Sequence, residues 1–171
     1  DADSLKISQM LHTIGDFERL GDHAVNMLHA AQELYEKRLV FSSAAKKELS
    51  VLLEAIQEIL SLTQKAYQLG DLTIAMQVEP LEQTIDQLVT RIKSRHIKRL
   101  QAGECSIELG FVLSDVLTNL ERVSDHCSNI AVAVIELSHS SFDTHKYLDG
   151  IRSESGQYKD AYNQFSVKYT L

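Results

Sequence analysis

Two short stretches of the chain carry the same set of acidic, basic and imidazole side chains. The pattern Glu-Arg-x-x-Asp-His-x-x-Asn begins at Glu18 and again at Glu121, so the two copies lie 103 positions apart. Within each copy the Glu and the Asp are four residues apart, which on a helix puts both carboxylates on one face. Like charges at this spacing repel, and the repetition suggests that a cation offsets the repulsion. Such self-similarity indicates a duplicated structural unit.

A third Glu/Asp pair with the same spacing, Glu82 and Asp86, precedes the second copy. It lies about 20 residues before a short joint at 101–105, and the pair Glu121 and Asp125 lies about 20 residues after it, so a helical hairpin would bring the four carboxylates level. That array repels itself strongly without a counter-charge. Carboxylate oxygens suit Mg, Ca, Mn or iron better than zinc, so the spacing predicts a metal site.

Other interpretations of these residues stay open. Helical carboxylates are usually solvated, and the Arg of each copy could neutralise them. His23 and His126 each follow the Asp by one residue, which turns them about 100° away from it. They are therefore cluster ligands, groups that orient a ligand, or surface residues. Asn26 and Asn129 lie one turn further along the stripe, where we expect hydrogen bonds between helices.

The composition favours an all-α fold. The 171 residues include one Pro, seven Gly and no Trp, and breakers are that scarce mainly in helical proteins. Apolar residues recur at steps of three and four. They predict four long helices with short joints, an antiparallel up-down bundle, over about 4–37, 44–69, 72–100 and 106–138.

Several residues mark the expected helix ends. Ser42 or Ser43 is available as an N-cap of the second helix, Gly70 closes it, and Asp71 caps the third helix. Pro80 either kinks the third helix or begins a new one, because Pro lacks the N–H and crowds the preceding turn.

The end of the chain differs in character from the rest. Four of the six tyrosines fall after residue 140, and short helices are expected over 144–152 and 157–165. This tail either packs its aromatic side chains on the bundle or docks a partner.

Composition also excludes some classes of function. A net charge of −7 argues against a nucleic-acid partner held by phosphate contacts. Cys105 and Cys127 fit reduced thiols of a cytosolic protein. No apolar run approaches the roughly 20 residues of a membrane span. Glu136 and His139 form a single Glu-x-x-His motif, whereas a carboxylate-bridged di-metal enzyme needs two.

These residues resemble the PhoU family, whose three-helix repeat carries a Glu/Asp-x-x-x-Asp motif on its second and third helices. Glu82–Asp86 matches the second-helix motif, and Glu18–Asp22 and Glu121–Asp125 match the third-helix motif, with Val123-Ser124 in place of the usual Ile-Gly. The resemblance implies PhoU-like repeats with a truncated first one. Residues 1–40 would be its third helix, 41–140 a complete second repeat, and 141–171 the Tyr-rich tail.

The resemblance also implies a set of metal ligands. One full carboxylate cluster is expected at Glu82, Asp86, Glu121 and Asp125, and half a cluster at Glu18 and Asp22. The metal would be iron or another divalent ion such as Mn, Mg or Ca.

More closely, the string from Ile7 to Asn26 and the Tyr-rich end resemble the PhoU-like domain at the carboxyl end of bacterial Na/Pi cotransporter family proteins. This implies a non-catalytic regulatory domain of a sodium-dependent phosphate transporter. It would lie in the cytoplasm, attached to the inner membrane by the transmembrane transporter domain of the same polypeptide, whose spans would precede residue 1. A homodimer fits this role, and no direct small organic substrate is expected. The alternatives are a stand-alone PhoU-type regulator of phosphate uptake and, less well supported, a carboxylate-bridged di-metal enzyme.

Overall fold

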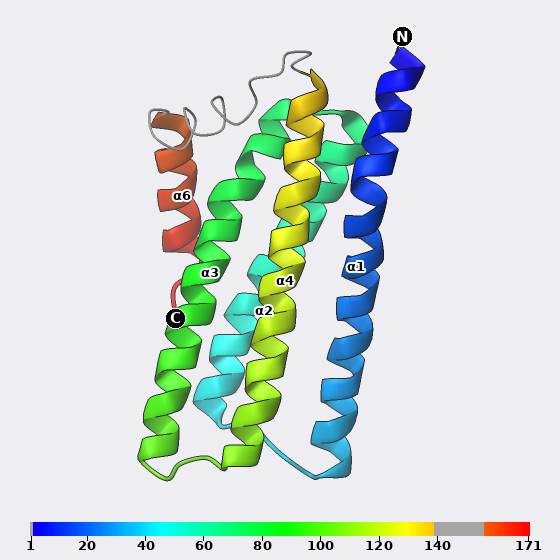
Figure 1. The fold of residues 1–171 in the computed structure, drawn as a ribbon. Helices are drawn as coiled ribbons and strands as arrows, with labels where there is room; N and C mark the ends of the chain where they lie inside the picture. The colour runs from blue at the N-terminus through cyan, green and yellow to red at the C-terminus, as the bar shows by residue number, and fades with distance from the viewer. Residues whose placement is uncertain (1, 139–155) are drawn as a thin grey trace.

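The computed structural model describes residues 2–138 and 156–171, and it shows four long antiparallel helices with a shorter helix at one side (Figure 1). Its elements are α1 (Ala2–Glu36), α2 (Ser43–Leu69), α3 (Leu72–Gln101), α4 (Ile107–Ser138) and α6 (Gly156–Lys168). No strand occurs within these described ranges. The predicted all-α up-down bundle is confirmed.

Local chemistry at the helix ends explains where the helices begin and stop. The Ser42 hydroxyl accepts a hydrogen bond from the Ala45 N–H at 3.2 Å, which satisfies one free donor of the first turn of α2. Gly70 adopts a left-handed φ of 63° at the end of α2, a conformation that glycine reaches without strain. Asp71 then accepts from the Thr73 and Ile74 N–H groups and starts α3. The predicted caps are confirmed.

Pro80 lies inside a continuous α3, so the interpretation that a new helix begins there is wrong. A proline removes one intrahelical hydrogen bond and crowds the preceding turn. Packing on both sides offsets this cost, since Val78 and Leu81 are fully buried. The Thr84 hydroxyl also donates to the Pro80 carbonyl oxygen at 2.9 Å.

The core lies between α2, α3 and α4, whose facing stripes are fully buried, while α1 packs mainly on α4 (Figure 1). The largest fully buried side chains come from these three helices and include Leu52, Ile59, Leu81, Ile85, Leu88, Ile92, Leu113, Leu117 and Ile130. The outer face of α1 keeps a row of large apolar side chains exposed, namely Ile7, Met10, Leu11, Ile14, Val25 and Leu28. The three helices of the second repeat thus share one core, whereas α1 is buried mainly on the side that faces α4.

The described part of the tail packs on the bundle, which is the first of the two alternatives for it. α6 lies beside α3 (Figure 1), where Phe165 and Tyr169 are buried against the core. The Tyr169 hydroxyl donates to the carboxylate of Glu58, and Tyr158 donates to the Gln83 side-chain oxygen at 2.8 Å. The short helix expected over 144–152 lies outside the described residues.

Two further expectations concern cysteines and membrane spans. Cys105 and Cys127 are both free thiols, as predicted. Among the residues that the structure describes, none of the helices combines the length and apolar character needed to cross a bilayer.

Candidate metal centre

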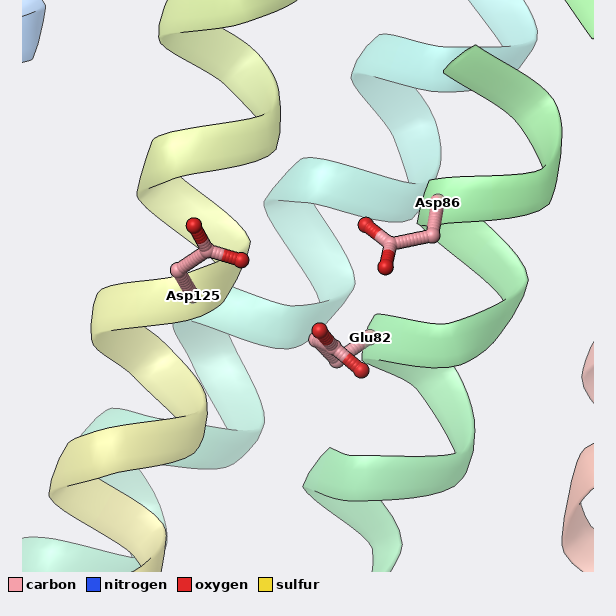
Figure 2. A group of neighbouring side chains, drawn as sticks. All are labelled: Glu82, Asp86 and Asp125. Atoms are coloured by element: carbon pink, nitrogen blue, oxygen red, sulfur yellow. The ribbon is translucent and has the colours of Figure 1, made fainter. Parts of the chain in front are cut away.

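Three carboxylates from two helices converge in the seam between α3 and α4. Glu82 and Asp86 point from α3 and Asp125 points from α4, and one oxygen of each lies within 4.8 Å of the others (Figure 2). The antiparallel hairpin produces this meeting, because α3 and α4 are joined by a tight turn at Gly103, whose φ is 71°. Of the residues described, only this group gathers three acidic, His or Cys side chains at metal-binding distance.

Asp86 contributes a buried carboxylate oxygen without a partner to this group. Its Oδ1 atom is inaccessible to solvent and accepts no hydrogen bond. Burial raises the pKa of Asp86, and the negative charges of Glu121, Asp125 and Glu79 raise it further. Buried carboxylate oxygens normally have partners, and a missing one is costly. A hard cation among these oxygens would satisfy Oδ1 and offset the repulsion, so the donor set fits such an ion.

Glu121 was predicted as a fourth ligand, and the structure places it beside the group with a different partner. Its Oε2 accepts from the Lys93 ammonium at 3.0 Å. Glu121 nevertheless acts on the pKa of Asp86, so it belongs to the same acidic seam. Lys93 lies two turns after Asp86 on the same face of α3, which brings its ammonium to Glu121.

Arg122 neutralises the Glu121 and Asp125 pair only weakly. Arg122 contacts Asp125 at 3.4 Å, and the Arg122 side chain is largely exposed to solvent. Exposed ion pairs of this kind contribute little. Neutralisation by arginine, the alternative to a metal, therefore involves only Asp125 among the three converging carboxylates.

Glu18 and Asp22, the predicted half-cluster, are both exposed on the outer face of α1. They do not join the carboxylates of α3 and α4. Their equivalents Glu121 and Asp125 face α3, because α4 turns this side of the repeat toward the core. The same side of α1 carries the exposed apolar row.

The two repeated histidines meet between α1 and α4 and do not join the carboxylate group. The rings of His23 and His126 are stacked with centroids 5.5 Å apart. Nδ1 of His126 lies 2.8 Å from Oδ1 of Asp16, and Nδ1 of His23 lies 2.8 Å from Oδ1 of Asn119. These histidines therefore join the two repeats.

The repeated asparagines complete the same contact. Asn129 donates to Asp16 Oδ1 at 3.1 Å, and Asn26 donates to Asn119 Oδ1 at 3.0 Å. The prediction of interhelical hydrogen bonds from Asn26 and Asn129 is confirmed.

Sequence reasoning missed several of these partners. Asp16 and Asn119 stand two residues before each Glu-Arg pair, so extending the repeat toward its start would have found them. The seven-residue step from Asp86 would have placed Lys93 on the carboxylate face. No sequence signal indicates that Ser128 donates to Glu79 at 2.5 Å. Of the single Glu-x-x-His motif, Glu136 is exposed, and the His lies outside the described residues.

Comparison with known proteins places the chain in a family. The model of the PhoU domain matches residues 49–134, about half of the chain, and this span includes the three converging carboxylates. The chain belongs to the PhoU family.

Two relatives extend the similarity over more of the chain. The "phosphate-specific transport system accessory protein PhoU homolog 1" of Thermotoga maritima is 27% identical over 149 residues, which cover 87% of this chain and 63% of that protein. The "phosphate-specific transport system accessory protein PhoU homolog" of Deinococcus radiodurans is 26% identical over 130 residues, 75% of this chain and 59% of the relative. The chain thus spans about three fifths of these relatives. No solved structure matches.

Proposed function

We propose that this chain is a non-catalytic regulatory module of phosphate transport that binds a hard metal cation at Glu82, Asp86 and Asp125. The observation that carries the metal site is the buried Oδ1 of Asp86, which has no hydrogen-bond partner and lies among like charges. The two similar proteins are named as accessory proteins of a phosphate-specific transport system, which supports the regulatory role.

The chemistry of the three side chains favours particular ions. All three donors are carboxylate oxygens, a set that suits iron, manganese, magnesium or calcium, whereas zinc sites favour sulfur and nitrogen ligands. A bound cation would also lower the repulsion that Glu79 and Glu121 exert on Asp86. The proposed ion has a structural role: it links α3 to α4 and does not take part in a reaction.

The accessory role is better supported than attachment to a transporter in the same polypeptide. Both named relatives are accessory proteins. Three finer expectations stay predictions: a sodium-dependent transporter domain in the same polypeptide, a cytoplasmic position at the inner membrane, and a homodimer. The absence of a nucleic-acid partner or of a small organic partner is also still a prediction.

The di-metal enzyme is disfavoured by the ligand set. Ferritin-like sites take a Glu-x-x-His motif from each of two helices, and the carboxylate group contains no histidine. Oxygen consumption when the purified protein is loaded with ferrous iron would favour the enzyme over the regulator.

Phosphate uptake by cells tests the regulatory role. A bacterial strain that lacks its own PhoU-family proteins would receive the wild type, the double variant Asp86→Asn with Asp125→Asn, or the control Asp160→Asn on exposed α6. Uptake of radiolabelled phosphate should change with the wild type and the control and stay at the vector level with the double variant. Equal uptake in all strains, at matched protein levels, would argue against regulation of phosphate transport.

A further inference from the structure

The ion pair of Lys93 and Glu121 borders the three converging carboxylates. Lys93 stands seven residues after Asp86 on α3, and Glu121 stands four residues before Asp125 on α4. Both steps keep a side chain on the same helix face, so the pair continues the carboxylate seam by two turns on α3 and about one turn on α4. The distance of 3.0 Å between Nζ and Oε2 makes it a close contact.

The two members of this pair act on the metal site in opposite directions. Lys93 lowers the pKa of Asp86 while Glu121 raises it, although burial has the largest effect. Lys93 is therefore a cation that the chain itself supplies to the acidic seam. In the absence of a metal, the Lys93 ammonium neutralises part of the negative charge of the carboxylates between α3 and α4.

From this geometry we propose that Lys93 competes with the bound metal for Glu121, so that Glu121 is a conditional fourth ligand. The inference rests on the proposed metal site. Glu121 has two states: in one its carboxylate accepts from Lys93, and in the other it turns along the seam to the cation at Asp86 and Asp125.

The energetics allow this exchange. The side chains of Lys93 and Glu121 are 41% and 35% exposed, so solvent screens their attraction and the pair is weak. A divalent ion carries twice the charge of the ammonium and would sit among half-buried carboxylates, where screening is weaker. Glutamate also has one more rotatable bond than aspartate, which lets its carboxylate move while α4 stays in place.

The exchange links metal binding to the charge of the protein surface. When Glu121 turns to the cation, the Lys93 ammonium loses its partner and becomes available to solvent or to an anionic group. Metal binding would therefore change the charge presented on the protein surface at Lys93, without movement of α3 or α4.

A double-mutant cycle in the intact chain tests the proposal. The proteins are the wild type, Lys93→Met, Glu121→Gln and the double variant, with Lys98→Met as a control that removes a positive charge from an exposed part of α3. Affinity for Mn²⁺ is measured by calorimetry, and circular dichroism checks that each protein is folded. Methionine keeps the length of lysine without its charge.

Lys93→Met should bind Mn²⁺ about tenfold more tightly than the wild type, a coupling of ordinary size for neighbouring sites. Glu121→Gln alone should weaken binding by less than about threefold, since Lys93 already holds Glu121 away, yet in the Lys93→Met background it should remove the whole gain. Lys98→Met should bind as the wild type does.

Each contrary result is distinct. If Lys93→Met binds Mn²⁺ no more tightly than the wild type, or if its gain survives Glu121→Gln, the competition is overturned and the metal site itself stands. If none of the folded proteins binds Mn²⁺ or iron, the proposed metal function fails together with the inference.

Discussion

Asp16 on α1 and Asn119 on α4 are equivalent residues of the two repeats, 103 positions apart, and each accepts hydrogen bonds from the histidine and the asparagine of the other repeat. His126 and Asn129 meet Asp16, and His23 and Asn26 meet Asn119. The contact between α1 and α4 is therefore nearly two-fold symmetric. Among these six residues, the chemical difference between the two halves is the carboxylate at 16 opposite the amide at 119.

The asymmetry predicts unequal effects of the two histidines on stability. A hydrogen bond to an ionised acceptor is stronger than one to a neutral amide. His126→Ala should lower the free energy of unfolding by about 2 kcal/mol, and His23→Ala by about 1 kcal/mol. Urea unfolding followed by circular dichroism measures both. A larger loss for His23 than for His126 would contradict the assignment of Asp16 as the stronger acceptor.

Asp86 should cost stability in the metal-free protein. Because its pKa is raised, the folded chain holds this proton more tightly than the unfolded chain does. The stability due to Asp86 is therefore full below the ordinary Asp pKa of about 4 and falls as pH rises through the raised value. At neutral pH and without metal, Asp86→Asn should stabilise the fold by a few tenths to about 1 kcal/mol, the scale of such charge interactions.

A pH series of chemical unfolding in a chelator checks this sign. The stability difference between Asp86→Asn and the wild type should grow from acid to neutral pH. Asp160→Asn, on the exposed side of α6, is measured beside it as the control. A loss of stability in Asp86→Asn at neutral pH would mean that the carboxylate has a favourable partner.

Glu48 illustrates the opposite linkage. Burial favours the neutral acid, but hydrogen bonds and charges from Arg99 and Arg95 outweigh it and lower the pKa of Glu48. Arg99 Nη2 lies 2.8 Å from Glu48 Oε2, and both side chains are largely buried. Removing Arg99 would leave the buried Glu48 carboxylate with only the 3.3 Å contact to the half-exposed Arg95, so Arg99→Met should cost about 3 kcal/mol.

The same pair sets an acid limit on stability. Since the pKa of Glu48 is depressed, its contribution is present above the ordinary Glu value of about 4.5 and is lost as pH falls through the depressed value. Thermal unfolding of the wild type and Glu48→Gln between pH 3 and 7, values chosen to bracket the ordinary carboxyl range, should converge at the acid end. Parallel curves would show that the ion pair contributes nothing.

Equivalent small residues in the two repeats should respond differently to enlargement. Ser124 is fully buried, so Ser124→Leu should overpack the core around α4 and cost about 1 to 3 kcal/mol. Gly21 is exposed, and an added Cβ would meet nothing within 4 Å. Gly21→Ala should stabilise α1 by about 0.5 to 1 kcal/mol through helix propensity. Thermal midpoints measure both, and destabilisation by Gly21→Ala would show that something packs closely on that face.

The fold was largely predictable because it depends on local signals. Apolar periodicity placed the long helices, and short-range hydrogen bonds to Ser42 and Asp71 placed their ends. The meeting of Glu82, Asp86 and Asp125 also followed from helix geometry, since a short joint makes an antiparallel hairpin.

The rest depends on choices between partners, which sequence spacing does not rank. The antiparallel hairpin brings both Glu121 and Asp125 of α4 level with the carboxylates of α3. Asp125 joins those carboxylates, whereas Glu121 pairs with Lys93. The histidines beside Asp22 and Asp125 face the α1–α4 contact, because a step of one residue turns them toward the neighbouring repeat. Rotation of α1 about its axis, which decides what Glu18 meets, is a tertiary property.

Metal content is the most direct test of the account. The protein would be purified without chelator, analysed for metals, then stripped and titrated with ferrous iron and Mn²⁺ while its thermal midpoint is followed. The wild type should contain bound metal, and its thermal midpoint should rise with added ion, by mass action on the folded state. Both should be lost in the folded double variant Asp86→Asn with Asp125→Asn. A wild type that takes up no metal, or a double variant that binds as tightly, would contradict the metal site.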